Sequence, residues 1–333
     1  MNKKELIDAL SPGTDPAPFF ALADKVRRDN VGDGVHVRGL IEFSNTCRRN
    51  CRYCGIRAGN PKVRRYRLTK EEILACARTA VSLNYRTVVM QSGEDPAWSP
   101  RDVIPVLEAV KKETGLAITL SIGEHSREEY KALRAAGADR FLLRFETSDR
   151  ELFKALKPDS DYDRRFACLA WLKEAGFQVG SGVMAGLPGQ TLESLADDIL
   201  LFKKLDLDMV GIGPFIPNPD TPLAGSAGGT LDLGLRMVAL TRIVTVNTHI
   251  PATTAMGTLH PQGRQRALQC GANVLMPNIS PVEHRVDYSL YPGKICVSDA
   301  ADKCAGCVDA MLKSLGRTRA EGYGHSLKNA PKG

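Results

Sequence analysis

Between residues 35 and 280 the hydrophobic pattern of the chain alternates between short strand-like runs and longer stretches with helical periodicity. The short runs are rich in β-branched residues, whereas apolar positions in the longer stretches recur every three to four residues. The predicted strands span residues 35–44, 87–92, 117–122, 140–146, 178–185, 208–216, 250–257 and 274–280. The helices predicted between them include residues 69–83, 126–136, 192–205 and 233–246.

This alternation predicts the fold class. Strands that alternate with helices form parallel βαβ units, and eight such units predict an α/β fold, a complete (β/α)8 TIM barrel. A dinucleotide-binding fold is not indicated, because no Gly-x-Gly-x-x-Gly follows the first strand. We predict an N-terminal helical segment (1–34), a barrel (35–281) and a C-terminal cysteine-bearing extension (282–333). The active site of such a barrel lies at the C-terminal ends of its strands.

Composition and charge narrow the classes of function. The 333 residues are 43% hydrophobic and 25% charged, which is ordinary for a soluble globular protein. We expect a cytoplasmic protein without a membrane partner, because the chain has neither a long apolar run nor a secretion signal. The net charge of +7 is spread along the chain, so we expect no nucleic-acid partner. Nine cysteines in such a chain favour metal ligation over disulfides.

Three of these cysteines follow the first predicted strand with the spacing C-x3-C-x2-C. They are Cys47, Cys51 and Cys54. Cubane iron–sulfur clusters usually take four thiolates, so three would leave one iron open to a small molecule. A zinc site completed by a distant residue is the alternative. Arg48, Arg49 and Arg52 lie between the cysteines, where they either offset cluster charge or are solvated.

This motif, with Tyr53 before the last cysteine, resembles the signature of the radical S-adenosylmethionine (SAM) superfamily. The resemblance implies a 4Fe-4S cluster held by the three cysteines, with SAM chelated to the open iron. It also implies reductive cleavage of SAM to a 5′-deoxyadenosyl radical. The chain would then be an enzyme, and its cysteines would be both metal ligands and the catalytic centre.

The same resemblance implies a set of SAM-binding residues. They are Ser92, Gly93, Glu94, Glu146, Arg165, Gly211, Ile212 and Gly213. The ammonium, carboxylate and sulfonium groups of SAM need acidic and arginine partners in a closed pocket. Each charged residue also has a structural alternative. Glu146 could be a loop or capping carboxylate, Glu94 could cap the following helix, and Arg165 could lie on a solvated helix face.

Further stretches resemble the HydE family of FeFe-hydrogenase maturases, relatives of biotin synthase and methylornithine synthase. They are IEFSNTCRRNCRYCGIR, VVMQSGEDP, TLSIGE, VGIGPFIPNPDTPLA, IPATTAMGT and LYPGKICVSDAADKCAGC. The resemblance implies a role in assembling the diiron site, with other hydrogenase maturases and a reductant such as flavodoxin or ferredoxin as partners. Three alternatives stay open: a HydE-like enzyme with another sulfur-containing or amino-acid-derived substrate, an electron carrier or cluster scaffold, and a zinc-stabilised binding module.

The HydE resemblance also implies a small anionic substrate, such as an iron–cysteine synthon or a thiazolidine. The residues implied to bind it are Arg144, Thr119, Thr253, Thr254 and Tyr291. Arginine and hydroxyl donors in a dry cavity suit an anion, although threonines are also ordinary strand residues. Phe145 stands where the family is expected to have His. Strand alternation directs residue 145 away from the pocket that residues 144 and 146 face.

A second cysteine motif, C-x7-C-x2-C, lies beyond the last predicted strand. It comprises Cys296, Cys304 and Cys307. Three more thiolates can hold a second iron–sulfur cluster, and the alternatives are a zinc site or buried cysteines. The HydE resemblance implies that this cluster is auxiliary and dispensable. Cys76, Cys168 and Cys270 lie in predicted helices and are expected in the core.

Overall fold

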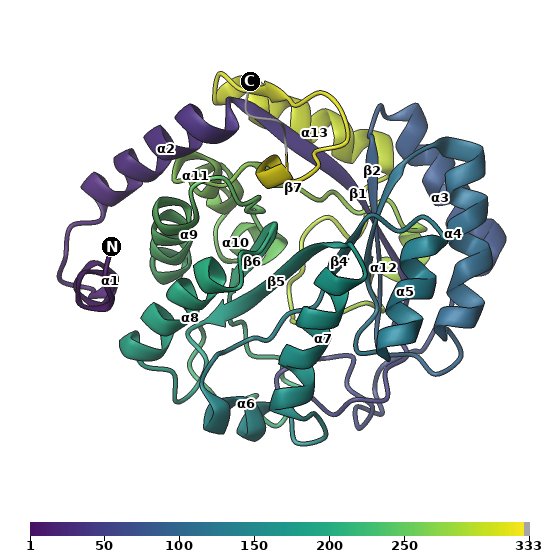
Figure 1. Cartoon of the computed structure of the whole chain (residues 1–333), viewed down its shortest axis with the longest axis horizontal. Coiled ribbons are helices and arrows are strands. Elements are labelled where there is room, and N and C mark those ends of the chain that lie inside the picture. The colour runs from purple at the N-terminus through teal and green to yellow at the C-terminus, as the bar shows by residue number, and fades with distance from the viewer. Residues whose placement is uncertain (330–333) are drawn as a thin grey trace.

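In the computed structural model, which describes residues 1–329, a curved parallel sheet is surrounded by helices (Figure 1). The sheet order is β6-β5-β4-β3-β2-β1-β7, and every neighbouring pair is parallel. The strands are β1 (Gly34–Ser44), β2 (Thr87–Ser92), β3 (Ala117–Ser121), β4 (Arg140–Leu142), β5 (Gln178–Ala185), β6 (Met209–Pro214) and β7 (Val274–Leu275).

The prediction of a complete barrel with eight regular strands is wrong, because seven strands form this sheet path. The predicted strand 250–257 contributes only an isolated bridge, from Pro251 to Val274, and the preceding His249 forms another with Met209. Pro251 lacks the N–H that a ladder needs, and helix α10 begins immediately after Thr253. The segment predicted as a strand does lie between β6 and β7, but it forms isolated bridges and the start of α10.

Two other predicted strands are shorter than expected. β4 ends at Leu142 rather than at residue 146, since Phe145 N donates to Ser181 Oγ at 3.3 Å instead of to a backbone carbonyl. β7 ends at Leu275 rather than at residue 280, and Pro277 follows closely. The backbone beyond Leu142 and beyond Leu275 is therefore irregular at the C-terminal end of the sheet.

The helices that were predicted occur within one or two residues of their expected bounds, and Thr69 and Glu72 form a capping box at the start of α3. The helices are α1 (Lys3–Leu10), α2 (Ala17–Val31), α3 (Lys70–Ser82), α4 (Pro100–Thr114), α5 (Arg127–Ala135), α6 (Arg150–Leu156), α7 (Tyr162–Glu174), α8 (Leu192–Lys204), α9 (Leu231–Thr245), α10 (Thr254–Leu259), α11 (Gly263–Gln269), α12 (Val282–Arg285), α13 (Ala301–Ser314) and the 3₁₀ turn η1 (Leu327–Asn329). Among the residues that the structure describes, no helix is long and apolar enough to cross a membrane.

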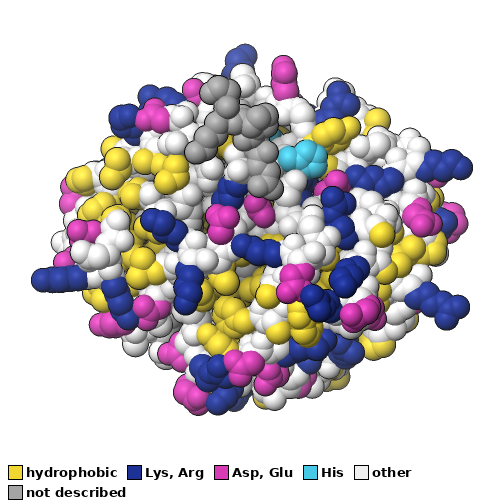
Figure 2. All heavy atoms as spheres, in the orientation of Figure 1, with side chains coloured by type: hydrophobic (Ala, Val, Ile, Leu, Met, Phe, Trp, Pro, Cys, Tyr) yellow, Lys and Arg dark blue, Asp and Glu magenta, His cyan; other side chains and the backbone are white. Residues whose placement is uncertain are grey.

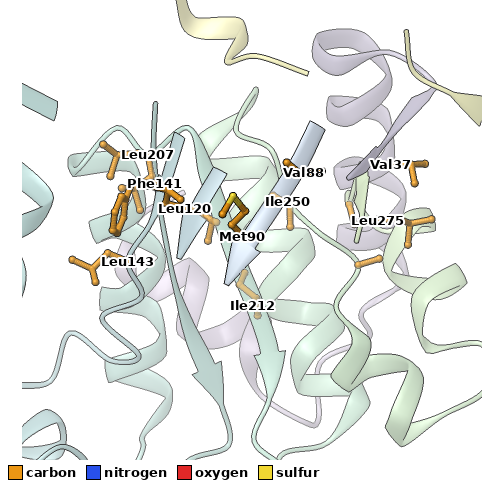
Figure 3. Close-up of a cluster of buried hydrophobic side chains, with 14 of the residues drawn as sticks. Val37, Val88, Met90, Leu120, Phe141, Leu143, Leu207, Ile212, Ile250 and Leu275 are labelled. Atoms are coloured by element: carbon orange, nitrogen blue, oxygen red, sulfur yellow. The ribbon is translucent and has the colours of Figure 1, made fainter. Parts of the chain in front are cut away.

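Strand alternation separates an apolar layer from a polar interior. Val88, Met90 and Leu120 belong to the layer of buried side chains that Figure 3 draws. The opposite face carries polar groups, for example Thr119 on β3 and Arg38 on β1, whose Nη1 lies 3.1 Å from Met209 Sδ on the non-adjacent β6. The inside of the curved sheet is therefore a polar, positively charged lumen. On the face in Figure 2 the Lys and Arg side chains are scattered rather than gathered in one patch.

The C-terminal segment closes the lumen at the N-terminal ends of the strands. Strand β8 (Thr318–Arg319) pairs with the start of β1. Beyond it, the carbonyl oxygen of Tyr323 accepts from Arg140 Nη2 at 2.7 Å, and that of Gly324 accepts from Arg38 Nη2 at 3.1 Å. Backbone carbonyls thus accept hydrogen bonds from two buried guanidinium groups and cover this end of the lumen.

Candidate active site

The cysteine loop, residues 45–69, joins β1 to α3 at the C-terminal end of the sheet. It contains several arginines and no Asp or Glu. Arg65 braces the loop from within, since its guanidinium donates to the carbonyl oxygens of Asn45, Ile56 and Arg57 at 2.6, 2.7 and 2.6 Å. Hydrogen bonds between the Arg65 side chain and the backbone of the same loop therefore stabilise the conformation of the cysteine loop.

The cysteine loop packs tightly against the loop after β2. An ideal Cβ at Gly93 would lie 2.3 Å from the carbonyl oxygen of Thr46 and 2.7 Å from Cys47 Cβ. The backbone N–H of Arg48 donates to the carbonyl oxygen of Glu94 at 3.0 Å. A side chain at position 93 would separate the two loops, so the Ser92-Gly93-Glu94 stretch has a structural reason to contain glycine.

Cys47, Cys51 and Cys54 are unpaired thiols that lie close together. Burial raises the pKa of the Cys54 thiol, and the neighbouring Cys51 and Cys47 raise it further. Burial likewise raises the pKa of Cys47. Thiolates crowded in this way are stabilised by a bound cationic centre, and the donor set fits an iron–sulfur cluster. Within residues 1–329, no three His, Cys, Asp or Glu side chains converge around the position of a single metal ion.

A buried network of two acids and two arginines lies beside the cysteine loop. Arg49 Nε is 2.6 Å from Glu94 Oε2, and Arg49 Nη2 is 3.0 Å from Glu124 Oε2. Arg165 Nε is 2.8 Å from Glu124 Oε1, with side-chain exposures of 4% and 5%. Although burial alone would raise it, the charges of Arg165 and Arg49 hold the pKa of Glu94 below its ordinary value. Two carboxylates thus face two guanidinium groups in this network.

This network decides several alternatives that the sequence left open. Arg165 is internal, so the alternative of a solvated helix face is excluded for it. Glu94 does not cap α4, because Ser99 and Asp102 form that capping box. Arg49 is internal as well, whereas Arg48 and Arg52 are exposed.

Sequence reasoning missed Glu124, Lys157 and the internal role of Arg49. Glu124 ends the TLSIGE stretch just beyond β3, so its place at a strand end could have identified it in the same way as Glu94. Lys157, which follows α6, is buried, and burial followed by the charge of Arg165 lowers its pKa. No spacing or periodicity in the sequence marks Lys157.

The segment after β4 places Arg144 and Glu146 on one side and Phe145 on the other. Phe145 packs against Phe166 and Phe202, with ring centroids 5.4 and 5.7 Å apart. This arrangement confirms that residue 145 faces away from the lumen. Arg144 Nη2 donates to Val183 O at 2.6 Å and lies 3.1 Å from Glu146 Oε2.

Glu146 adopts a left-handed backbone conformation, with φ of 68°. Residues other than glycine rarely do so, and such strain is concentrated at functional sites. The Glu146 backbone remains tied to β5 through its N–H, which donates to Gly182 O at 3.0 Å. The strained backbone therefore holds the Glu146 carboxylate beside Arg144 at the end of the sheet.

On β6, Gly211 and Gly213 flank Ile212, whose side chain belongs to the apolar layer (Figure 3). A Cβ built on Gly213 would lie 3.4 Å from Thr253 Oγ1. Gly213, which is expected to bind SAM, and Thr253, which is expected to bind the substrate, are therefore neighbours.

The expected substrate residues fall into two groups. Thr119 Oγ1, Thr253 Oγ1 and Arg144 Nε are buried without a hydrogen-bond partner among the described residues. Buried polar groups usually have a hydrogen-bond partner, so these three atoms are candidates for contacts with a bound molecule. Burial raises the pKa of Tyr291 and the charge of Glu42 raises it further, whereas a hydrogen bond to Thr258 and the charge of Arg144 oppose this rise. Thr254 instead lines a cavity that contains the tail cysteines.

The tail cysteines converge on this second cavity, which has a volume of about 70 Å³. Cys304 is buried, and burial together with the nearby Cys296 raises its pKa, while Cys307 is exposed. Lys294, Lys303 and Arg264 also line the cavity. Cys76, Cys168 and Cys270 are buried, as predicted for core residues.

Comparisons with known proteins define the class first. A model of the Radical SAM superfamily matches residues 41–202, which include the cysteine loop, both acids of the buried network and Arg165. The chain is thus a radical SAM enzyme, a class that uses a 4Fe-4S cluster and S-adenosylmethionine. It is 51% identical, over 96% of its length and 92% of the relative, to the FeFe-hydrogenase maturase subunit HydE of Thermotoga maritima. It therefore belongs to the HydE family.

Other relatives agree on the fold. The chain is 28% identical to 3-methylornithine synthase of Methanosarcina acetivorans over 81% of its length and 77% of the relative. The crystal structure of methylornithine synthase PylB superposes with a TM-score of 0.84 at 27% identity, covering 96% of this chain and 94% of that one. The structure of the hydrogenase maturase HydG superposes with a TM-score of 0.74 at 20% identity, over 83% of this chain and 64% of that one, a likeness of fold alone.

Proposed function

We propose that this chain cleaves S-adenosylmethionine reductively during the maturation of the FeFe-hydrogenase diiron site. The observation that carries the proposal is the group of three close thiols, Cys47, Cys51 and Cys54, beside a buried acid–arginine network. When bound there, a reduced 4Fe-4S cluster supplies the electron that breaks the sulfonium bond. The cysteines would be its three ligands, leaving one iron for SAM.

The residues of the chain would bind and orient SAM. Glu94 would take the ammonium group and Arg165 the carboxylate, which are charge-matched contacts for both groups. Glu124, which pairs with Arg165, would orient the guanidinium group. The remaining contacts are assigned to Ser92, Gly93, Glu146, Gly211, Ile212 and Gly213. The acids and arginines of the network pair in charge, so binding of SAM would exchange one charged partner for another.

The substrate is proposed to be a small anion, an iron–cysteine synthon or a thiazolidine-like molecule. Arg144, Thr119, Thr253 and Tyr291 would hold it in the lumen. The buried, unpartnered Thr119 Oγ1, Thr253 Oγ1 and Arg144 Nε support this assignment. Thr254, which the sequence also suggested, lies on the tail cavity and would act at its border with the lumen.

The proposal extends to the tail, the partners and the compartment. Cys296, Cys304 and Cys307 would hold a second iron–sulfur cluster in the extension (282–333), outside the catalytic α/β domain (35–281). The electron donor would be a flavodoxin or ferredoxin, and the other hydrogenase maturases would act with this chain in the cytoplasm. The family name and the free thiols around the tail cavity support these assignments.

A second candidate is a HydE-like enzyme that acts on another amino-acid-derived substrate. The 0.84 TM-score with methylornithine synthase favours it. A reconstituted maturation assay separates the two candidates, since apo-hydrogenase incubated with the companion maturases should become active only when this chain is added. An inactive hydrogenase, in an assay where this chain still cleaves SAM, would favour the second candidate.

A further inference from the structure

The two ends of the cysteine loop meet at its base, beside the C-terminal end of β1. Ser44 forms an isolated antiparallel bridge with Arg67, and the backbone N–H of Leu68 donates to the carbonyl oxygen of Phe43 at 2.8 Å. The three ligand cysteines lie between these two ends. The loop that carries them therefore stays closed only while the contacts of its base are made.

Asp95, from the loop after β2, bonds to both ends of this base. Its Oδ2 accepts from Ser44 Oγ at 2.6 Å and from Arg67 Nε at 2.7 Å. Its Oδ1 accepts from Arg67 Nη2 at 2.9 Å and from the backbone N–H of Ala97 at 3.0 Å. The side chain of Asp95 is fully buried, whereas that of Arg67 is 46% exposed. One carboxylate thus joins the two ends of the cysteine loop to the loop after β2.

The charge of Asp95 makes these contacts strong. Burial would raise the pKa of Asp95, but hydrogen bonds from Arg67 and Ser44 outweigh burial and lower the pKa below its ordinary value. Hydrogen bonds to a carboxylate are stronger than neutral ones, and a two-pronged pair with arginine also fixes the geometry. Ser44 Oγ has one further acceptor in the base, the carbonyl oxygen of Tyr66 at 3.3 Å. Without the carboxylate, the base would therefore be held by fewer and weaker bonds.

The same contacts tie the base to the residues expected to bind SAM. Asp95 directly follows Glu94, whose carbonyl oxygen accepts from the N–H of Arg48, next to the first ligand cysteine, at 3.0 Å. The N–H of Gly93 donates to the carbonyl oxygen of Ser44 at 3.0 Å. The contacts of Asp95 therefore hold the cysteine loop and the SAM-binding loop together at the point where β1 and β2 end.

We propose that Asp95 is a positioning residue that keeps the base of the cysteine loop closed and so controls how firmly the loop retains its cluster. The inference rests on the proposed function, which assigns the cluster to this loop. Asp95 acts through Ser44 and Arg67 and need not contact the cluster or SAM.

The first measurement is hydrogen exchange in the full-length protein before cluster reconstitution, followed by mass spectrometry. Asp95→Asn keeps the shape of the side chain but removes its charge, so the base should open about tenfold more often. The N–H of Leu68 exchanges only when its bond to Phe43 opens, so its exchange should become faster by the same factor. Exchange in β3 should not change, since a local opening leaves the core closed. Unchanged exchange at Leu68, or equal acceleration in β3, would overturn the proposal.

Iron release measures the consequence for the cluster. The tail cysteines are replaced by Ala in every protein compared, so that only the cysteine loop contributes iron. After anaerobic reconstitution, a ferrous chelator should extract iron from Asp95→Asn about tenfold faster than from the parent protein. Release at the parent rate would refute the link between Asp95 and the cluster.

Asp139→Asn is the matched control for both measurements. Asp139 also has a basic partner, Lys111 at 2.6 Å, and accepts from the backbone N–H of Ile118 at 2.8 Å. It precedes β4 and so lies at the opposite end of the sheet. Its replacement should leave exchange at Leu68 and iron release unchanged.

Arg67→Ala covers the case in which Asp95→Asn does not fold. The Arg67 side chain is partly exposed, so its removal is easier to tolerate, yet it breaks the two-pronged pair with Asp95. Exchange at Leu68 should become about threefold faster, and unchanged exchange would also overturn the proposal. SAM cleavage separates the two levels of the argument. If the wild type does not cleave SAM, the proposed function fails; if it does and the variants keep normal exchange and iron release, only the inference fails.

Discussion

Arg144 offers a direct test of the substrate site. Its side chain is 30% exposed, donates to Val183 O at 2.6 Å and pairs with Glu146 at 3.1 Å. A hydrogen bond to a charged group contributes ~1.5–3 kcal/mol. Because a substrate carboxylate would compete with Glu146 for the guanidinium group, we take the lower end, ~1.5 kcal/mol. Arg144→Ala should therefore weaken substrate binding by about tenfold.

The assay is a titration of a thiazolidine dicarboxylate into reconstituted wild type, Arg144→Ala and Arg144→Lys. Lysine should recover only part of the loss, since an ammonium group lacks the planar fork that matches a carboxylate. Arg150→Ala, which removes an exposed arginine on α6, should bind the ligand as the wild type does. Equal affinities for wild type and both Arg144 variants would refute the assignment and leave Arg144 as the structural partner of Glu146.

Replacing all three tail cysteines by Ala should lower the iron content, measured by colorimetric assay, yet leave SAM cleavage intact; lost cleavage would contradict an auxiliary role. Burial raises the pKa of Asp198 to about 7, above its unfolded value. Between about pH 4 and pH 7 the native state therefore binds more protons than the unfolded state, so the free energy of unfolding should fall as pH rises. Asp198→Asn should reduce this dependence of the free energy of unfolding on pH, measured by denaturant titration. Ending the chain at Glu321 removes carbonyl partners of buried Arg38 and Arg140 and should lower Tm by about 5 °C in calorimetry; an unchanged Tm would show that the segment does not stabilise the barrel.

The parts of the fold that the sequence predicts are those set by local periodicity and capping. The strands around Val88 and Leu120, and the helix that Thr69 caps, are of this kind. The segment around Pro251 was misjudged because its apolar character reflects burial between β6 and β7, not a ladder of backbone hydrogen bonds. A short apolar run has the same sequence pattern whether it is a buried irregular segment or a buried strand.

The candidate site divides in a similar way. The cysteine motif is contiguous, so its spacing predicts it directly. Glu124 meets Arg165 across 41 residues, and Glu42 meets Lys294 across 252. Such pairs depend on which loops the folded sheet brings together, and no local pattern encodes them. The contact between Arg140 and Tyr323 could not be predicted from the sequence, because its acceptor is a backbone carbonyl oxygen, which every residue has.

The central claim is that Cys47, Cys51 and Cys54 hold the cluster that cleaves SAM. The most direct measurement is the formation of 5′-deoxyadenosine, by chromatography, after anaerobic reconstitution and reduction with dithionite. The wild type should release 5′-deoxyadenosine, and the variant with all three cysteines replaced by Ala should release none while keeping its fold by circular dichroism. Release of 5′-deoxyadenosine by that triple variant at the wild-type rate would contradict the account.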